Sequence, residues 1–383
     1  MLKGNRAIAS FGICLCVLLL IAGAPRFAAQ DEGTHLRVTV NLVQLNVAVT
    51  DSKGNYISGL KPENFEITED KIPQRIATFE EGNGPAIRPG QSRETPSPNE
   101  ASGQGQTTPG AAATAAPEAP PGETSSGTAV EAPDRIPAAA MASAMAGANI
   151  YILFDTSNYM YHGFVYAQDA ISDFVRSMDS ASHIAFYSYS RDLSRATMLT
   201  ADRFRVVNGV RSTVAGDDAA LYNSLLMTVK DAAFLTGRKA IVVFSNGPDN
   251  ASSVPPEDVA ELAQDTGTII YIVSTRLAQD DPVSAAAFER MSRATGGKAY
   301  FAGNWRKEKE AFTSIREDLG HLYSVSYYPQ ANPNRGWRSI SVKLVGPGTE
   351  KYRIRTRDGY RLLPPTQINA DNDFAAGAGS DHQ

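Results

Sequence analysis

Residues 149–159 read NIYILFDTSNY, an apolar stretch that runs directly into a polar one. Its first six residues are almost continuously apolar, which is typical of a short strand buried on both faces of a sheet. Asp155, Thr156 and Ser157 follow directly, and residues of this kind favour turns and loops. Open α/β sheets bind ligands where buried strands end in such polar loops. The stretch therefore predicts both a central strand and a candidate binding edge.

Strands and helices alternate beyond this stretch. Because each strand is followed by a helical pattern, we expect a doubly wound, mostly parallel sheet with helices on both faces, a Rossmann-like α/β domain over 148–322. The predicted strands are 149–154, 183–188, 239–244, 268–274 and 298–301, and the helical patterns are a stretch ending at Met178, then 219–235, 255–266, 283–294 and 305–322.

Two β-rich segments flank this domain. Residues 36–50 alternate apolar and polar positions, as a strand does, within an N-terminal β segment at 36–81. Three further strands are predicted at 323–328, 338–344 and 352–357, within a C-terminal β segment at 323–363. Each segment alone is too small for a stable core, so we expect the two to complete one small β-sandwich-like domain. Residues 364–383 are predicted to be a disordered tail.

The N-terminus has the layout of an export signal. Lys3 and Arg6 precede an apolar run, and small residues follow up to Ala29, so we expect a signal peptide at 1–29. An uncleaved membrane anchor is the alternative, since the run is near the minimum length for crossing a bilayer. Either interpretation predicts a secreted or periplasmic protein. Residues 82–147 are rich in Ala, Pro, Gly and Ser, which predicts a disordered linker.

Composition excludes several classes of function. The 383 residues include 36 Lys+Arg and 41 Asp+Glu, a net charge of −5 that argues against a nucleic-acid partner. Both cysteines, Cys14 and Cys16, lie in the predicted signal, so the exported part has no disulfide, thiolate metal site or cysteine nucleophile. No G-x-S-x-G elbow, phosphate loop or histidine metal pair appears. We therefore expect a protein that is not an enzyme.

Two charged clusters lie in the β segments. Arg353, Arg355 and Arg357 alternate and so share one strand face, which fits either an acidic partner or a charged edge strand. Glu66, Glu69 and Asp70 are most simply interpreted as a solvated strand end.

Three polar loops are predicted at the carboxyl ends of the parallel strands. They comprise residues 155–159, 216–219 and 245–250, and they bring carboxylates, hydroxyls and amides to one edge. Oxygen donors of this kind are what Mg²⁺ prefers. The alternative is a purely structural role, in which Asp155 and Asn246 serve as turn and helix-capping residues.

Short stretches distributed along the chain resemble a known family. They are VNLVQLNVAVTDSKGNYISGLKPENFEITEDK (40–71), ILFDTSN (152–158), AALYNSLL (219–226), GRKAIVVFSNGPDNAS (237–252), ATGGKAYF (294–301), YSVSYYP (323–329) and RTRDGY (355–360). On these motifs the region 148–322 resembles a von Willebrand factor A domain. Residues 36–80 with 148–361 look like the von Willebrand factor A-related family described from Acidobacteria.

The resemblance implies a metal-ion-dependent adhesion site, with Asp-x-Ser-x-Ser in the first loop, Thr in the second and Asp in the third. Asp155 and Ser157 match this pattern, but Tyr159, Ala219 and Asn246 replace the second Ser, the Thr and the Asp. We therefore expect a degenerate site. The candidate metal residues are Asp155, Ser157, Asp218 and Asn246, and the candidate ligand-binding residues of the same face are Asn158, Tyr159, Asp217 and Asp249.

These features predict an exported, non-catalytic binding or adhesion-type protein that engages an unknown protein or extracellular polymer. The first alternative is Mg²⁺-dependent adhesion in which Asp217 or Asp218 compensates for the lost ligands. An enzyme, based on the cluster of Tyr159, Tyr161 and His162, is the second alternative. The membrane is a partner only if the N-terminal segment remains uncleaved.

Overall fold

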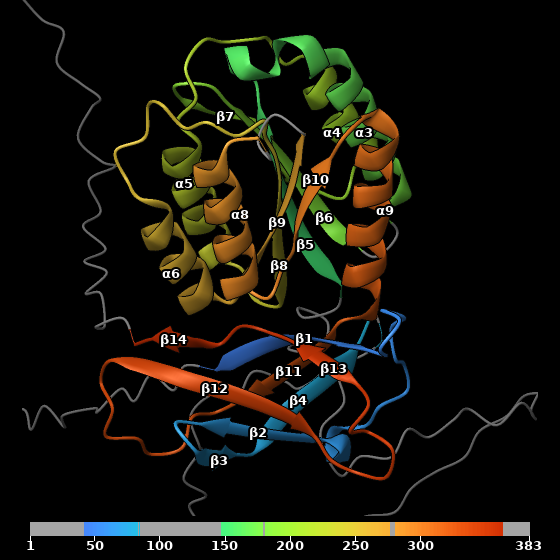
Figure 1. Ribbon diagram of the computed structural model, residues 1–383, viewed down its shortest axis with the longest axis vertical. Helices are drawn as coiled ribbons and strands as arrows, with labels where there is room; N and C mark the ends of the chain where they lie inside the picture. Colours follow the sequence, from blue (N-terminus) through green and yellow to red (C-terminus); the bar gives the residue numbers. More distant parts are fainter. Residues whose placement is uncertain (1–41, 83, 85–146, 179–180, 276–279, 363–383) are drawn as a thin grey trace, which may run out of the picture. The chain divides into compact units, whose positions relative to one another are not determined.

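The computed structural model describes residues 42–82, 84, 147–178, 181–275 and 280–362, which form an α/β domain and a β-sandwich (Figure 1). The predicted signal at 1–29, the predicted tail at 364–383 and nearly all of the predicted linker at 82–147 lie outside the described residues. No helix in the described part of the chain is long and apolar enough to cross a membrane.

The α/β domain contains one six-stranded sheet, and its five consecutive parallel strands confirm the predicted doubly wound fold. Only the last strand, at the edge, is antiparallel to its neighbour. In spatial order the strands are β10 (Ala299–Ala302), β9 (Thr268–Thr275), β8 (Arg238–Phe244), β5 (Ala148–Asp155), β6 (Ala181–Tyr189) and β7 (Leu193–Thr200).

Helices cover both faces of this sheet (Figure 1). Each buries an apolar stripe; in α5 it is Leu221, Leu225, Val229 and Ala232, spaced three or four residues apart. One face carries α3 (Phe164–Ser177), α4 (Arg203–Arg211) and α9 (Trp305–His321), and the other carries α5 (Leu221–Ala233), α6 (Pro256–Thr266) and α8 (Pro282–Ala294).

Three local features differ from the sequence prediction. Strand β7 and helix α4 were not predicted, because β7 is mostly exposed and lacks an apolar alternation. The helical pattern before Met178 begins with a 3-10 helix, η2 (Asn158–Gly163), before α3 starts.

The β-sandwich contains two four-stranded sheets, and each sheet takes strands from both terminal segments, as predicted. The first sheet has the order β13 (Arg353–Arg355), β1 (Val43–Thr50), β11 (Tyr323–Tyr327) and β4 (Ile76–Glu81). The second has the order β14 (Gly359–Arg361), β12 (Trp337–Leu344), β2 (Phe65–Glu69) and β3 (Ile72–Gln74), with a short 3-10 helix, η1 (Pro62–Asn64), leading into β2. The stretch 352–357 was predicted as one strand, and β13 occupies only residues 353–355 of it, whereas β14 follows it and was not predicted.

Strand β1 contributes to two hydrophobic cores at once. Val43, Leu45, Val47 and Val49 face the sandwich core, whereas Ala48 packs into the core of the α/β domain. Successive side chains of a strand point to opposite faces, so one strand can serve both cores. The first sheet of the sandwich is therefore covered on both sides.

A buried carboxylate fastens the two β segments to each other. Glu69 is fully buried and accepts from Arg338 Nη1 at 2.8 Å and from the hydroxyls of Tyr327 and Tyr360, each at 2.9 Å. The interpretation of Glu69 as a solvated residue is therefore wrong. Glu69 lies in the N-terminal segment and its three partners in the C-terminal one, so the contact holds together parts that are distant in sequence.

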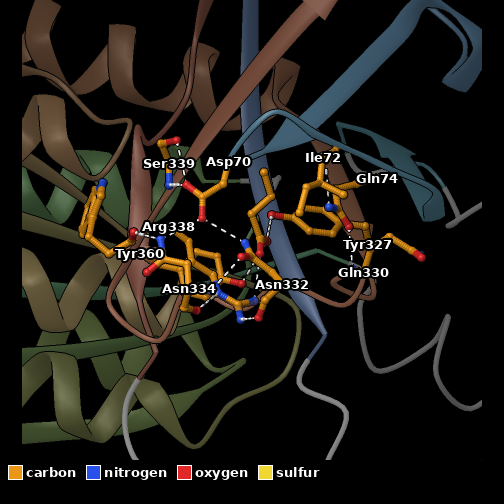
Figure 2. A network of polar contacts seen from close by, with 12 residues as sticks. Asp70, Ile72, Gln74, Tyr327, Gln330, Asn332, Asn334, Arg338, Ser339 and Tyr360 are labelled. Carbon is orange, nitrogen blue, oxygen red and sulfur yellow. Dashed lines mark hydrogen bonds and ion pairs between the residues drawn. The ribbon is translucent and has the colours of Figure 1, made fainter.

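Asp70 extends this polar network at the turn between β2 and β3 (Figure 2). Its carboxylate accepts from Asn332 Nδ2 at 2.9 Å, Asn334 Nδ2 at 2.8 Å, and the backbone N–H and hydroxyl of Ser339 at 2.9 and 3.0 Å. Partial burial alone would raise the pKa of Asp70, but these hydrogen bonds outweigh it and lower the pKa to about 2.

The sandwich and the α/β domain meet at a second buried carboxylate, Asp318 of α9. It is fully buried and accepts from the hydroxyls of Tyr56 and Tyr271, each at 2.7 Å, and it forms an ion pair with Arg355 of β13. Arg357 donates to the backbone oxygens of Gln264 in α6 and Gln44 in β1. Arg355 and Arg357 thus face the α/β domain and join it to the sandwich.

Replacing Asp318 by Asn should destabilise the protein strongly. The variant keeps the shape and the acceptor oxygen but leaves the charge of Arg355 without its carboxylate, so we expect a loss of about 3–5 kcal/mol in the free energy of unfolding. Asp173→Asn is the matched control, because Asp173 is about half exposed and pairs with Arg176 and Lys309 on the surface. It should cost under about 1 kcal/mol. Chemical denaturation measures both, and equal losses would contradict the assigned role of Asp318.

Asp70 should also add an acid-dependent component to stability. Its folded pKa of about 2 lies below the ordinary value of 3.8, so its contribution is present above pH 4 and is lost as the pH falls toward 2. Asp70→Asn should reduce the slope of unfolding free energy against pH in that window. Urea denaturation at a series of pH values measures the slope. An unchanged slope in the variant would show that Asp70 is not the group responsible.

Candidate functional site at the carboxyl edge of the central sheet

Three loops meet at the carboxyl ends of the central strands and form what we call the top face, residues 155–159, 216–219 and 245–250. Direct hydrogen bonds join the first two loops, from Asn158 N to Asp217 O at 2.9 Å and from Gly216 N to Thr156 O at 2.7 Å. Asn246 Nδ2 donates to Tyr159 O at 2.8 Å and joins the third loop to the first. Hydrogen bonds within the protein thus connect all three loops.

Asp155 is the innermost charged group of this face. It ends β5, is fully buried, and accepts from Ser157 N at Oδ1 and from Ser245 Oγ at Oδ2, each at 2.9 Å. Ser245 Oγ accepts in turn from the hydroxyl of Tyr189 at 3.0 Å. Burial raises the pKa of Asp155, and the hydrogen bonds from Ser157 and Ser245 oppose that shift. Ser157 and Ser245 therefore donate to a carboxylate that solvent does not reach, and Tyr189 donates to Ser245 behind it.

Two buried oxygens of the first and third loops have no hydrogen-bond partner in the described part of the chain. Ser157 Oγ and Asn246 Oδ1 are buried and make no hydrogen bond with any of the described residues. A buried polar atom without a partner costs free energy, which favours a bound water molecule or another small ligand at this point.

Asp218 of the second loop and Asp249 of the third are engaged elsewhere. Asp218 forms an ion pair with Arg191 at 2.8 Å and accepts from Asn250 Nδ2 at 3.3 Å. Asp249 accepts from Tyr222 N at 2.9 Å and from Ser252 N at 2.8 Å. The carboxylate of Asp249 therefore satisfies a backbone donor in the first turn of α5, as a helix cap does.

The remaining candidates line the surface of the top face. Asn158 and Asp217 are exposed, and Tyr159 is half-buried against the core beneath α5. Ala219 is fully buried and has no side-chain oxygen, while its backbone N–H donates to Asn250 Oδ1 at 2.8 Å. In the part of the chain that the structure describes, no group of three or more His, Cys, Asp or Glu side chains could hold a metal ion.

Sequence reasoning did not identify Tyr189 or Arg191 as parts of this face, and it included Ser245 and Asn250 only as members of a predicted loop. Ser245 and Asn250 lie inside a predicted loop, so their position gave a signal. Tyr189 ends an apolar strand and Arg191 follows it, and nothing in the local pattern distinguishes them.

Comparison with known proteins places this geometry in a recognised fold. Residues 149–314 match the family model of the von Willebrand factor type A domain. No sequence among curated proteins matches the chain.

Several solved structures resemble the chain. The BatB protein from Bacteroides thetaiotaomicron, described as a conserved hypothetical protein, has 14% identity, a TM-score of 0.38, and coverage of 45% of this chain and 97% of that one. The vWF domain of the type V pili tip protein Mfa5 from Porphyromonas gingivalis has 12% identity, a TM-score of 0.39, and coverage of 49% and 98%. A von Willebrand factor type A protein from Catenulispora acidiphila has 12% identity, a TM-score of 0.39, and coverage of 56% and 67%.

The match to the family model agrees with the doubly wound sheet, the helices on both of its faces and the three loops at its carboxyl edge. Residues 149–314 of this chain therefore have a von Willebrand factor A-like fold.

Proposed function

We propose that the protein is an exported, non-catalytic binding or adhesion-type protein whose top face engages a protein or extracellular polymer without a metal ion. The observation that carries the proposal is the hydrogen bond from Asn246 Nδ2 to Tyr159 O. An aspartate at position 246 would present only acceptors to that carbonyl oxygen, and a cation would be needed between them. The asparagine donates instead, so the first and third loops are joined directly.

The donors at this face fit Mg²⁺ poorly. A magnesium ion needs a near-octahedral shell of oxygens and is normally bound through one or two carboxylates. Asp155 is already hydrogen-bonded at both oxygens, Asp218 is paired with Arg191, and Ala219 offers no side-chain oxygen. These contacts support a degenerate metal-ion-dependent adhesion site.

The exposed groups then determine which partner the top face accepts. Asn158 offers an amide, Asp217 a carboxylate, and Tyr159 the edge of a half-buried ring. A partner would meet hydrogen-bonding groups and one negative charge rather than a cation. The arrangement supports recognition of polar or basic groups on a protein or polymer.

The absence of a reactive arrangement at this face supports a binding role. Ser245 is buried, and its hydroxyl is occupied by Asp155 and Tyr189, so it is not poised as a nucleophile. The predicted signal at 1–29 supports export, and the motifs of both β segments support membership in the von Willebrand factor A-related family described from Acidobacteria.

A second candidate function is Mg²⁺-dependent adhesion. The unpartnered Ser157 Oγ and Asn246 Oδ1 are the observation that favours it, because both are buried oxygens of the top-face loops. Asp218 would have to leave Arg191, or Asp217 to turn inward, to complete the shell.

Binding through the top face should not depend on magnesium. The immobilised protein should retain the same partners from a cell-envelope extract in millimolar Mg²⁺ and in excess EDTA. Asp217→Lys should reduce retention, because it reverses the charge of an exposed residue of the face. Glu350→Lys makes the same charge change at an exposed position of the sandwich and should retain wild-type binding. Retention that EDTA abolishes would favour the second candidate.

Asn246→Asp should convert the loops from metal-independent to metal-responsive. The variant loses the donor to Tyr159 O and adds a charge near Asp155, so we expect a loss of about 1–3 kcal/mol in EDTA, part of which Mg²⁺ restores. The melting temperature of the wild type should not change with millimolar Mg²⁺. Thermal denaturation measures both, with Asn158→Asp as an exposed control. A wild-type melting temperature that rises with Mg²⁺ would contradict the metal-free proposal.

A further inference from the structure

The three top-face loops carry acidic side chains and no basic one. Together they contain four aspartates and neither a lysine nor an arginine. Asp155 is buried among its donors, and Asp218 is paired with Arg191. Asp249 accepts from the backbone of α5 and is half-buried. Asp217 alone of the four is exposed, so it presents a negative charge that attracts cationic groups of a partner.

Large apolar side chains are exposed beside these loops. Tyr161 of η2 is 73% exposed, and Val165 and Tyr166 in the first turn of α3 are 62% and 63% exposed. Val214, in the segment after α4, is 80% exposed. We call these four residues the tyrosine patch. Burying such side chains would be favourable, and tyrosine is enriched where proteins bind each other, so the patch has the composition of an interaction surface.

A backbone contact holds η2, and with it Tyr161, beside the exposed carboxylate. Asn158 is the first residue of η2, and its N–H donates to Asp217 O at 2.9 Å. Side chains three residues apart in a 3-10 helix lie on the same side, so Tyr161 follows Asn158 along one side of η2. Both residues are exposed. The tyrosine patch therefore begins within one helical turn of the loop that carries Asp217.

Side-chain hydrogen bonds hold the rest of the patch together. Gln168 Nε2 of α3 donates to Val210 O at 2.9 Å and to Thr213 Oγ1 at 3.0 Å, which fixes the start of α3 against the end of α4. Val165 lies one turn before Gln168, and Val214 directly follows Thr213. The two valines are thus brought to neighbouring positions, and the patch is a preformed surface.

Exposed tyrosine rings next to a carboxylate favour a cationic partner over an acidic or a purely apolar one. The face of an aromatic ring attracts ammonium and guanidinium groups. The aliphatic stems of Lys and Arg also cover apolar side chains while their charged ends remain in water. An acidic segment would be repelled by Asp217, and an apolar segment would bury that carboxylate without a donor.

We propose that the partner of the top face is a basic protein segment, whose Lys or Arg side chains pair with Asp217 and lie over the rings of Tyr161 and Tyr166. The aliphatic stems of these side chains cover Val165 and Val214. The inference rests on the function proposed for the top face and names the chemistry of the partner. It also extends the binding surface from the three loops to η2, the start of α3 and the segment after α4.

Labelled peptides of equal length test the charge preference. Each is built on Gly and Ser and carries several Arg, several Gln or several Glu residues, and fluorescence anisotropy measures its binding to the full-length chain in EDTA. The Arg peptide should bind at least tenfold more tightly than the Gln peptide, and added NaCl should weaken it because exposed charges are screened. The Glu peptide should not bind. Equal affinities for the Arg and Gln peptides would overturn the proposal.

Variants locate the Arg peptide on the protein. Tyr161→Ala should weaken its binding about two- to fivefold, whereas Tyr161→Phe should keep it because the ring remains. Asp217→Asn should weaken it by a similar factor. Phe204→Ala is the matched control for the ring, since Phe204 has the same 73% exposure but lies at the opposite end of α4 from the patch. Glu350→Gln removes an exposed charge of the sandwich and is the control for Asp217.

Both control variants should bind the Arg peptide as the wild type does. All four positions are exposed, so each variant should also melt with the wild type. Equal losses in the controls and in the patch variants would mean that the peptide follows the general acidity of the chain, which would overturn the proposal.

A cell-envelope extract separates this inference from the proposed function. Excess Arg peptide should displace the partners that the immobilised protein retains, and the Gln peptide should not. Partners that are lost with Asp217→Lys but not displaced by the Arg peptide would support the proposed function and overturn the basic segment. Retention that survives protease treatment of the extract would assign the face to a carbohydrate polymer and overturn it too. If the extract yields no partner, the proposed function fails, and the peptide affinities alone decide the charge preference.

Discussion

The shared carboxylate of Asp318 is the contact on which the arrangement of the described residues depends. Tyr56, Tyr271 and Arg355 come from three separated stretches of the chain, and all of them donate to this one side chain. Burying a carboxylate costs free energy unless donors satisfy its oxygens. The three donors therefore stabilise Asp318 only when all of them are in place. The α/β domain and the sandwich therefore have one mutual orientation instead of a loose connection. The apolar alternation of β1, which serves both cores, reinforces the same orientation.

Much of the fold could be predicted from the sequence because a strand buried on both faces of a sheet is an almost continuous apolar run. The runs 149–154 and 239–244 are almost entirely apolar, and both are central strands. Strand β7 escaped prediction because a mostly exposed edge strand has no such constraint. Glu69 was misread for the opposite reason: it is charged and close to a turn, yet its partners Arg338, Tyr327 and Tyr360 are more than 250 residues away. Local pattern carries no information about partners so distant.

At the candidate site, too, the sequence predicts local features but not the contacts between residues that are distant in the chain. Sequence motifs located the three loops and identified which positions lack the expected oxygen ligands. They did not reveal that Asp218 is paired with Arg191 or that the carboxylate of Asp249 satisfies a donor in α5. Both facts depend on the direction in which a side chain points from a loop. The donor role of Asn246 is a similar case, because an amide can either donate or accept and only its neighbour Tyr159 decides which.

The divided sandwich also has a consequence for how the chain is made. Strand β1 pairs with β11, whose residues are about 280 positions later in the sequence. During synthesis from the N-terminus, the strands of the first β segment therefore remain unpaired until residues 82–322 and the C-terminal strands have been synthesised. Contacts so distant in sequence form slowly, and unpaired strand edges promote aggregation. The α/β domain, by contrast, has every strand of its sheet between residues 148 and 302. Folding would then begin in the middle of the chain, and closure of the sandwich would be the last step, reached only by chains in which residues 323–361 have been made.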